Sequence, residues 1–191
     1  MSKYLIIFAH PSHEGHSGYL LSEIEKRLKN EQKDYELIDL YALNYDPLLK
    51  KEELYSAGNK EISEENLIFQ TKITTADRLI FIYPIWWQNM PAILKGFLDR
   101  VITGGFGFKY VLGVPVGLLK GKKAAIFASS AGPAIYTRFF TANAAINALK
   151  KHILAFCGMK TKSFLFANAR NLEKNKDRLA KTAINILHYL R

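Results

Sequence analysis

The stretch from Leu79 to Arg100 constrains the fold of this chain more than any other. It opens with the apolar run LIFIY (Leu79–Tyr83), passes through a turn that holds both tryptophans of the chain, and continues as an amphipathic segment from Pro91. Proline suits the first position of a helix, where its missing N–H has no partner to lose. The pattern predicts a buried strand, a turn at its carboxyl end and then a helix.

The two tryptophans of this turn, Trp86 and Trp87, are adjacent in the sequence. In an open α/β sheet, ligands bind at the carboxyl ends of the strands. Two neighbouring indoles at that place favour a flat aromatic ligand, and a flavin ring is the most economical candidate. The alternative is that both indoles fill the core between sheet and helix.

Five apolar runs recur along the chain, and segments with helical periodicity lie between them. Runs that are apolar throughout are typical of strands buried on both faces, as in a parallel sheet. The alternation predicts an α/β fold with helices on both sides of the sheet. The expected strands are Tyr4–Ala9, Tyr35–Leu40, Leu79–Tyr83, Ala124–Ser129 and Lys162–Ala167, and the expected helices are Gly18–Lys29, Ala92–Ile102, Thr137–Phe156 and Glu173–Leu190.

Two longer intervals separate these elements. Tyr41–Thr75 holds a turn and one or two polar helices, whereas Thr103–Lys123 is rich in glycine and aromatic residues. Neither resembles an interdomain linker, and long loops in a compact domain are usually functional or mobile. With 191 residues, the chain is expected to form one domain over residues 1–191.

The chain is basic, with 27 lysines and arginines against 17 acidic residues and a formal net charge of +10. Its lysine clusters are not interleaved with aromatic residues for base stacking, so nucleic acid is not expected as a partner. Positive potential would instead attract anionic dinucleotides. The single cysteine, Cys157, allows no internal disulfide and fits a reducing cytoplasm. No apolar run reaches the roughly 18 residues of a membrane span.

The first loop that could carry chemistry is Ala9–Leu20, between the first strand and the first helix. Gly15, Ser17 and Gly18 would present backbone N–H groups at a helix start, with Ser17 as the expected N-cap. Such a terminus binds phosphate. Three histidines in this loop raise a metal site as an alternative, but no acidic or cysteine partner has ligand spacing, and no metal is expected.

A second such loop, Ser129–Tyr136, follows the fourth expected strand. Gly132 and its small neighbours let the backbone approach a ligand, and Ser129 and Ser130 offer hydroxyl groups. A serine hydrolase is the rival interpretation, but the GxSxG motif is missing. Tyr136 either bonds a ligand carbonyl or packs on the edge of the sheet. Together with the tryptophan turn, three loops with suitable groups are expected at one edge of the sheet.

These residues resemble the flavodoxin-like NAD(P)H:quinone oxidoreductases. The matching pieces run in order from the first strand to near residue 158, and the block from Pro84 to Val101 is the most specific. The resemblance implies a three-layer sandwich around a five-stranded parallel sheet of order 2-1-3-4-5. It also implies a tightly bound flavin and a homodimer with active sites at its interface.

The resemblance further implies roles for individual residues. The first loop would hold the phosphate side, the tryptophan turn would lie along the isoalloxazine, and Trp87 matches the family tryptophan best. The small-residue loop would bond the pyrimidine edge of the ring, and Tyr136 would lie near its O2 carbonyl as the catalytic residue. The implied flavin contacts are His10, Ser17, Gly18, Tyr19, Pro84, Ile85, Trp86, Trp87, Ser129, Ser130, Ala131, Gly132 and Tyr136. The implied substrate contacts are Trp87, Phe106, Phe108 and Tyr110, with Phe108 and Tyr110 contributed by the dimer partner.

Two positions depart from the family pattern. Ala142 stands where the mammalian enzyme has a histidine that helps to handle the proton, which leaves water as the alternative proton source. Phe108 replaces a hydroxyl-bearing tyrosine. FAD is preferred to FMN because Asp39–Leu49 and Gly104–Tyr110 look most like FAD-binding members, while the choice between NADH and NADPH stays open.

The function implied is that of a cytoplasmic NAD(P)H dehydrogenase, whose flavin takes hydride from NAD(P)H and passes it to a quinone or a similar electrophile. Two other roles remain. A flavodoxin-type electron carrier is expected to be acidic, so the net charge of +10 counts against it. An ancillary regulatory flavoprotein of a membrane potassium-efflux transporter is compatible with the resemblance but is not favoured.

Overall fold

The main sheet of the protein consists of parallel strands. The computed structural model describes residues 3–54, 61–137 and 143–191. Within these residues the sheet has five strands in the order β2-β1-β3-β6-β7, which confirms the expected order. The strands are β1 (Tyr4–Phe8), β2 (Tyr35–Asp39), β3 (Arg78–Pro84), β6 (Lys123–Ser129) and β7 (Lys160–Phe166).

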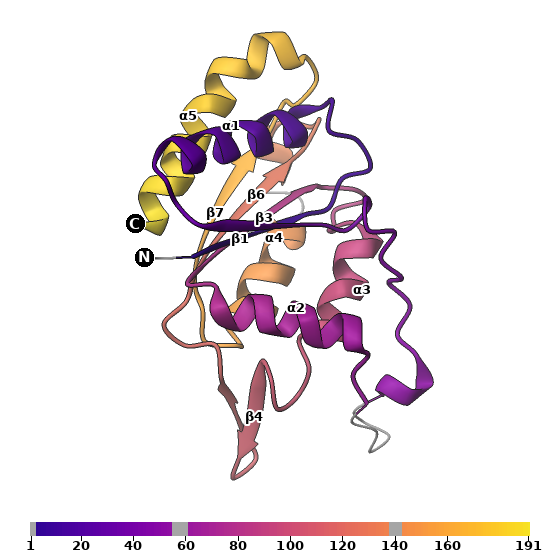
Figure 1. The fold of residues 1–191 in the computed structure, drawn as a ribbon. Coiled ribbons are helices and arrows are strands. Elements are labelled where there is room, and N and C mark those ends of the chain that lie inside the picture. Colours follow the sequence, from indigo (N-terminus) through magenta and orange to yellow (C-terminus); the bar gives the residue numbers. More distant parts are fainter. Residues whose placement is uncertain (1–2, 55–60, 138–142) are drawn as a thin grey trace.

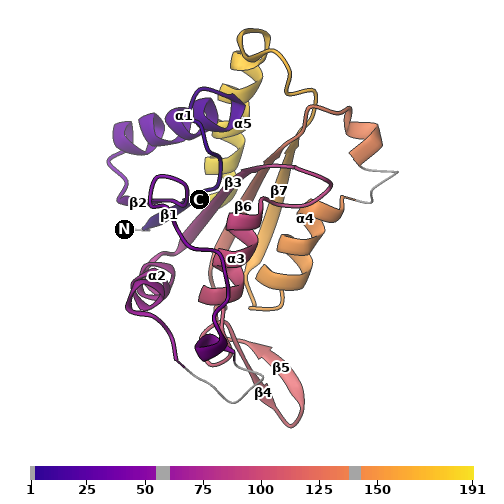
Figure 2. The same cartoon turned by 90° about the vertical axis from the view of Figure 1, so that its right-hand side faces the viewer.

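Helices cover the sheet on both faces, which gives the three layers seen in Figures 1 and 2. Helices α1 (His16–Asn30) and α5 (Leu172–Leu190) lie on one face. Helices α2 (Glu64–Thr75), α3 (Ala92–Val101) and α4 (Ala144–Leu149) lie on the other. None of the helices among the described residues combines the length and the apolar character needed to cross a membrane.

The alternation of side chains along each strand explains why the sheet needs both layers. On β1, Leu5 and Ile7 join the core under α2 and α3, whereas Ile6 and Phe8 join the core under α1 and α5. Successive side chains of a strand point to opposite faces, so a strand that is apolar throughout must be covered twice. All five strands expected from the apolar runs are confirmed within one or two residues.

A β-hairpin that the sequence did not predict occupies the glycine-rich interval. Strands β4 (Phe108–Val111) and β5 (Val114–Gly117) pair antiparallel around a turn at Leu112 and Gly113, both of which have positive φ. Strand β5 contains Pro115, which a strand at the edge of a sheet tolerates. The hairpin starts from the edge where β6 and β7 begin, since the Leu119 N–H donates to the Cys157 carbonyl at 2.9 Å.

Helical structure within the expected segment Thr137–Phe156 is less regular than its periodicity indicated. Asn143 adopts a left-handed conformation with φ of 54° and precedes α4. A π-helical turn, η4 (Lys150–Leu154), follows directly. The segment therefore does not form one continuous α-helix over its described part.

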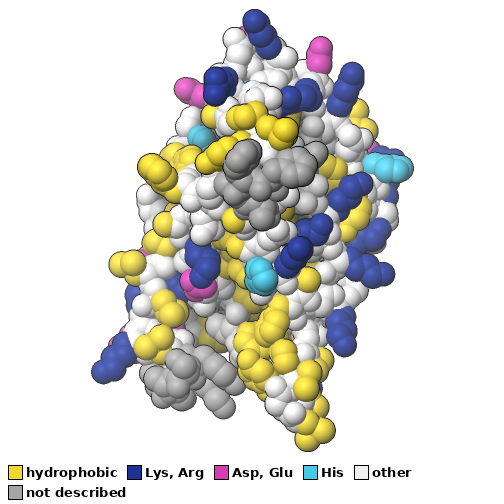
Figure 3. Space-filling view, turned by 180° about the vertical axis from the view of Figure 1, so that it is seen from behind, with side chains coloured by type: hydrophobic (Ala, Val, Ile, Leu, Met, Phe, Trp, Pro, Cys, Tyr) yellow, Lys and Arg dark blue, Asp and Glu magenta, His cyan; other side chains and the backbone are white. Residues whose placement is uncertain are grey.

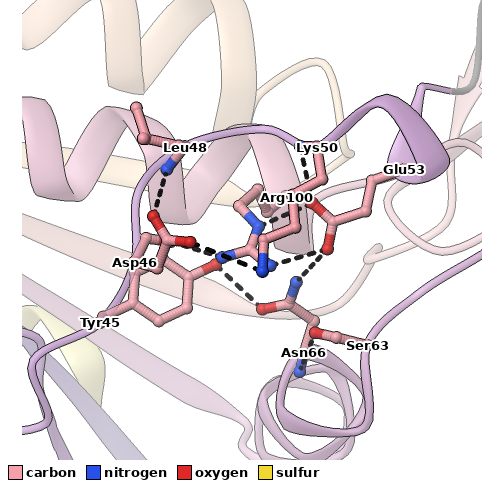
Figure 4. A network of polar contacts seen from close by, with 8 residues as sticks. All are labelled: Tyr45, Asp46, Leu48, Lys50, Glu53, Ser63, Asn66 and Arg100. Atoms are coloured by element: carbon pink, nitrogen blue, oxygen red, sulfur yellow. Dashed lines mark hydrogen bonds and ion pairs between the residues drawn. The ribbon is translucent and has the colours of Figure 1, made fainter.

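A buried polar network holds the connection between β2 and α2 in place (Figure 4). Arg100 of α3 makes two parallel hydrogen bonds to the Glu53 carboxylate, at 2.7 and 2.8 Å, and also donates to the Asp46 carbonyl. Glu53 ends the short 3-10 helix η1 (Lys51–Glu53). The Tyr45 hydroxyl donates to Asn66 of α2 at 2.9 Å.

The two charges of this network are almost fully buried. The side chains of Arg100 and Glu53 are only 3% and 8% exposed. Hydrogen bonds from Arg100 are the main cause that lowers the pKa of the Glu53 carboxyl. Burial raises the pKa of Tyr45 to about 12. The network thus ties a long loop to α2 and α3, next to the contacts that the Tyr45 ring makes with Phe69 and Phe97 in the core.

Replacing Glu53 with glutamine leaves the Arg100 charge buried without its partner. We expect the free energy of unfolding at neutral pH to fall by about 3 kcal/mol, measured by urea denaturation. Because the folded-state pKa of Glu53 is lowered from 4.5, its contribution is complete above that value and is lost as pH falls through the lowered folded-state pKa. The difference between the two proteins should therefore shrink in acid.

The matched control for this prediction is Asp99→Asn on the same helix. Asp99 pairs with Lys95 at 2.6 Å, but both side chains are about half exposed. We expect its loss to change the unfolding free energy by less than about 0.5 kcal/mol. Equal losses for the two variants would contradict a special role for the buried pair.

Candidate active site

The carboxyl ends of β1, β3 and β6 lie next to one another because these strands are neighbours in the sheet. The loops that follow them enclose a cavity of about 230 Å³. His10, His16 and Ser17 line it from the first loop, Pro84, Ile85 and Trp86 from the second, and Ser129 and Ala131 from the third. The structure therefore brings together residues from all three loops that the sequence singled out.

The start of α1 forms one end of this cavity. Gly15 is the N-cap and makes no side-chain cap bond, so the expectation that Ser17 caps the helix is wrong. The helix starts earlier, and Ser17 lies in its first turn, buried, with its hydroxyl 3.4 Å from that of Ser129. Among the described residues, no protein group accepts from the N–H groups of His16, Ser17 and Gly18. Such a terminus can bind an anion.

Gly18 has a packing reason to be glycine. A Cβ atom at this position would lie 1.9 Å from the carbonyl oxygen of His13, so the loop before α1 folds directly onto it. Tyr19, the next residue, borders a second cavity of about 290 Å³, which residues of α1 and of the start of α5 line. His13, Leu172 and Lys176 contribute to the same cavity, and so do the carboxylates Glu14 and Glu25.

The three histidines of the first loop have separate partners. The Nδ1 atom of His10 lies 2.6 Å from the Ser12 carbonyl oxygen. His13 pairs with Asp39 at 2.6 Å, and His16 contacts Asn175 at 3.1 Å. Burial is the main cause that lowers the pKa of His16. Each ring is thus held apart from the other two, and His10 and His16 are the two that border the cavity.

The tryptophan turn is a tight two-residue connection. Trp86 and Asn89 exchange backbone hydrogen bonds of 3.0 and 2.9 Å around Trp87 and Gln88, which both have positive φ. Trp86 is 41% exposed and borders the cavity, where its ring centroid lies 6.1 Å from that of His10. Trp87 is fully exposed and does not border it. The alternative that the indoles fill the core is therefore wrong.

Helix α3 begins at Ala92, as the expected range Ala92–Ile102 has it, but Pro91 does not occupy its first helical position. Pro91 is its N-cap, with ψ of 145°, and Ala92 is the first helical residue. The Pro91 carbonyl accepts the first bonds of the helix, from Leu94 and Lys95. The proline therefore ends the turn rather than opening the helix, because its extended ψ redirects the chain.

The first four residues of the segment Ser129–Tyr136, Ser129–Gly132, are called the small-residue loop from here on, and each of their carbonyls has a partner. The carbonyls of Ser129, Ser130, Ala131 and Gly132 accept in turn from Ile85 N–H, Ala169 N–H, Arg170 Nε and Asn168 N–H, at 2.7 to 3.0 Å. Within the described residues, the Ala131 N–H has no protein acceptor. The loop is thus held with its four carbonyl oxygens already bonded, and the Ala131 N–H remains as a donor for a ligand.

Three of those partners belong to a fourth loop that the sequence analysis missed. It joins β7 to α5, and Ala169 borders the cavity directly. The run Asn168–Asn171 offered a signal, because polar residues follow the expected strand Lys162–Ala167 at the same edge of the sheet. Its role was hidden because it supports the third loop through bonds to backbone carbonyls, two from backbone N–H groups and one from the Arg170 side chain, and such bonds leave no residue pattern.

Tyr136 lies beyond the small-residue loop and is 47% exposed. It is not among the residues that border the cavity. Ala142, the position where the family histidine is missing, lies outside the described residues. The role expected for Tyr136 therefore stays a prediction.

The expected substrate aromatics other than Trp87 lie away from this edge of the sheet. Phe106 packs against the core, while Phe108 and Tyr110 belong to β4, at the opposite edge of the sheet (Figure 2). The Phe108 ring lies 4.9 Å from that of Phe156. Toward the hairpin turn, Tyr110 is 60% and Leu112 fully exposed, and Figure 3 shows hydrophobic side chains gathered on this projection.

Charge is distributed unevenly around the site. No aspartate or glutamate occurs between Asp99 and Glu173, whereas lysines and arginines continue throughout that stretch. The hairpin, β6, the small-residue loop, β7 and the fourth loop all fall within it. The third and fourth loops thus bring no carboxylate to the cavity and favour an anionic occupant.

Comparisons with known proteins agree with this geometry. The family model described as "Flavodoxin-like fold" matches residues 2–190. An uncharacterized NAD(P)H oxidoreductase of Haemophilus influenzae is 34% identical, over 93% of this chain and 89% of that protein. The NAD(P)H:quinone oxidoreductase of Methanothermobacter marburgensis superimposes with a TM-score of 0.82 at 26% identity, covering 97% of this chain and 98% of the other.

A third neighbour shares the fold at lower identity. An FMN-dependent NADH-azoreductase of Bacillus anthracis, solved in complex with FMN, has a TM-score of 0.77 at 22% identity and covers all of both chains. The family match over nearly the whole sequence and the oxidoreductase relatives lead to one conclusion. The chain belongs to the flavodoxin-like family of NAD(P)H:quinone oxidoreductases.

Proposed function

We propose that this protein is a flavin-dependent NAD(P)H dehydrogenase that passes hydride from NAD(P)H to a quinone or a similar flat electrophile. One observation carries the proposal. A single cavity joins an uncapped helix N-terminus, an aromatic wall and a loop whose carbonyls are all tied back. The helix N-terminus suits a phosphate, the aromatic wall suits a flat ring, and the loop with its carbonyls already bonded suits an electron-rich ring edge.

The residues present fit a flavin. The N–H groups at the start of α1, with His10 and the Ser17 hydroxyl, would hold the phosphate. Pro84, Ile85 and Trp86 would lie along the ring. When bound, the flavin would supply the hydride chemistry, as cofactors commonly do. Within the protein, the Ser129–Gly132 loop would bond the pyrimidine edge, and Tyr136 is proposed near the O2 carbonyl.

Trp86 and Trp87 are proposed to serve different partners. Trp86→Ala removes a cavity wall, and we expect flavin affinity to fall about tenfold, since a buried aromatic contact exceeds its area burial by about 1 kcal/mol. Trp87→Ala should leave flavin affinity unchanged and raise KM for menadione, because its ring faces solvent. Fluorescence titration gives the first quantity, and NAD(P)H oxidation gives the second.

These measurements also test the function itself. A flavin-loaded protein whose NAD(P)H oxidation with menadione stays at background would refute the enzyme. That result would leave the electron carrier or the ancillary transporter subunit as the role of a flavoprotein. If Trp87→Ala weakened flavin binding as much as Trp86→Ala, the proposed division between the two indoles would be wrong.

FAD is the proposed cofactor, with FMN as the alternative. The second cavity, beside Gly18 and Tyr19, supports FAD because it adjoins the proposed phosphate end and has room for a further group. The FMN complex of the Bacillus anthracis azoreductase supports the alternative at the level of the fold. Both nucleotides share the ring and the first phosphate, so the first cavity alone does not separate them.

Mass spectrometry of the extracted cofactor distinguishes the two nucleotides. We further expect Leu172→Trp, which fills the second cavity, to weaken FAD binding about tenfold and to leave FMN binding unchanged. The reason is that only FAD would extend past α1. If this variant bound both nucleotides as tightly as the parent, the second cavity would not be part of the cofactor site.

A homodimer is proposed as the working assembly, located in the cytoplasm, with each chain acting as one flavin-binding domain. The exposed apolar side chains of the hairpin, Tyr110, Leu112 and Val114, support it. Their position at the far edge of the sheet means that Phe108 and Tyr110 would act on the partner's cavity, not on their own. Quinone and nicotinamide would then bind between one chain's flavin and the partner's hairpin.

Leu112→Glu places a charge on the most exposed apolar residue of the hairpin. We expect this variant to sediment as a monomer, to keep its flavin and to lose most of its menadione reduction. Lys109→Glu, on the same hairpin, is the control for charge alone. A Leu112→Glu protein that remained dimeric and fully active would contradict the proposed assembly.

A further inference from the structure

Arg170 stands out among the residues around the cavity because no expectation from the sequence included it. It follows β7 in the fourth loop, is exposed, and does not border the cavity itself. Its Nε donates to the Ala131 carbonyl at 3.0 Å. Ala131 does border the cavity, so Arg170 acts on the site through a neighbour.

The four carbonyls of the small-residue loop are held in two different ways. Three of them accept from backbone N–H groups, of Ile85, Asn168 and Ala169. Only the Ala131 carbonyl depends on a side chain. Without Arg170, the peptide between Ala131 and Gly132 would keep just the bond from the Gly132 N–H to the Ser130 hydroxyl, at 3.2 Å. This peptide is therefore the part of the loop that a single side chain can release.

The direction of that peptide matters for a ring that gains charge. Hydride adds two electrons and one proton, so a neutral oxidised ring carries one net negative charge after reduction. A carbonyl oxygen turned toward this ring would repel it, whereas N–H groups and a nearby cation would stabilise it. Because no carboxylate occurs between Asp99 and Glu173, the loop and its supports present no acidic side chain to offset the arginine.

We infer that Arg170 is a positioning residue for the flavin site, which holds the Ala131 carbonyl away from the cavity and keeps a positive charge beside the small-residue loop. The inference rests on the proposed flavin function. In this role Arg170 raises the reduction potential of the flavin, because the site then binds the reduced ring more tightly than the oxidised ring. The inference assigns no contact between Arg170 and the flavin itself.

The test compares the flavin-loaded parent with Arg170→Ala, Arg170→Lys and Lys181→Ala. Lys181→Ala removes the same charge from an exposed site on α5. We expect Arg170→Ala to bind reduced flavin about tenfold more weakly, relative to oxidised flavin, and so to lower the two-electron midpoint potential by about 30 mV. Arg170→Lys, which keeps the charge, should lose less than half of that shift, and Lys181→Ala should show none.

Hydrogen exchange supplies a readout that does not depend on turnover. The amide of Gly132, which donates to the Ser130 hydroxyl, should exchange faster in Arg170→Ala than in the parent, while the amides of β1 remain unchanged. An Arg170→Ala protein with the parental potential would overturn the inference, as would an equal loss in Lys181→Ala. If Arg170→Ala fails to fold, Arg170→Lys becomes the test. A lowered midpoint potential in that variant would support the inference, and the parental potential would overturn it. A parent that binds neither FAD nor FMN would instead refute the proposed function.

Discussion

The parallel register of β1, β3 and β6 is the constraint on which the rest of the structure depends. Phe8 pairs with Ile82, and Ile82 pairs with Phe127, so the three strands end at nearly the same level. Parallel strands point all their carboxyl ends to one edge. Three loops that are far apart in the sequence therefore meet around one cavity, and no residue within a loop has to reach across the molecule.

Backbone groups determine which hydrogen bonds this edge can offer to a ligand. The start of α1 offers N–H groups without protein acceptors, while the loop after β6 has all four of its carbonyls occupied. Donors thus remain for a ligand, and acceptors are withdrawn from it. The absence of carboxylates from Arg100 to Leu172 acts in the same direction, because no acidic side chain of that stretch offsets the field of the amides and arginines.

The hairpin lies at the opposite edge of the sheet. Gly117, at the end of the hairpin, packs directly on Cys157, where a Cβ atom would lie 2.2 Å from the cysteine carbonyl carbon. Burial raises the pKa of the Cys157 thiol to about 11, so this side chain acts as a packing residue and not as a nucleophile. The hairpin packs closely at its base and leaves its apolar turn exposed, and this turn is the surface assigned above to the proposed homodimer.

Local residue patterns were enough for the regular elements of the fold. Apolar runs such as Leu79–Tyr83 placed every strand of the main sheet, because burial on both faces permits few polar residues. The same patterns failed where local and tertiary preferences compete. The hairpin lies in an interval that was described only as a long loop rich in glycine, and Ser17 looked like an N-cap although the chain enters α1 two residues earlier.

The sequence by itself determined the layered fold, the edge at which the site lies and most of the residues that border it, because burial and glycine or proline chemistry are properties of short segments. Only the tertiary structure decided which indole faces the cavity, that Phe108 and Tyr110 lie at the other edge of the chain's own sheet, and that Arg170 supports the Ala131 carbonyl. These depend on backbone turns and on hydrogen bonds between loops about 40 residues apart. Such bonds involve the peptide group, which is the same in every residue, and so they leave no trace in the order of side chains.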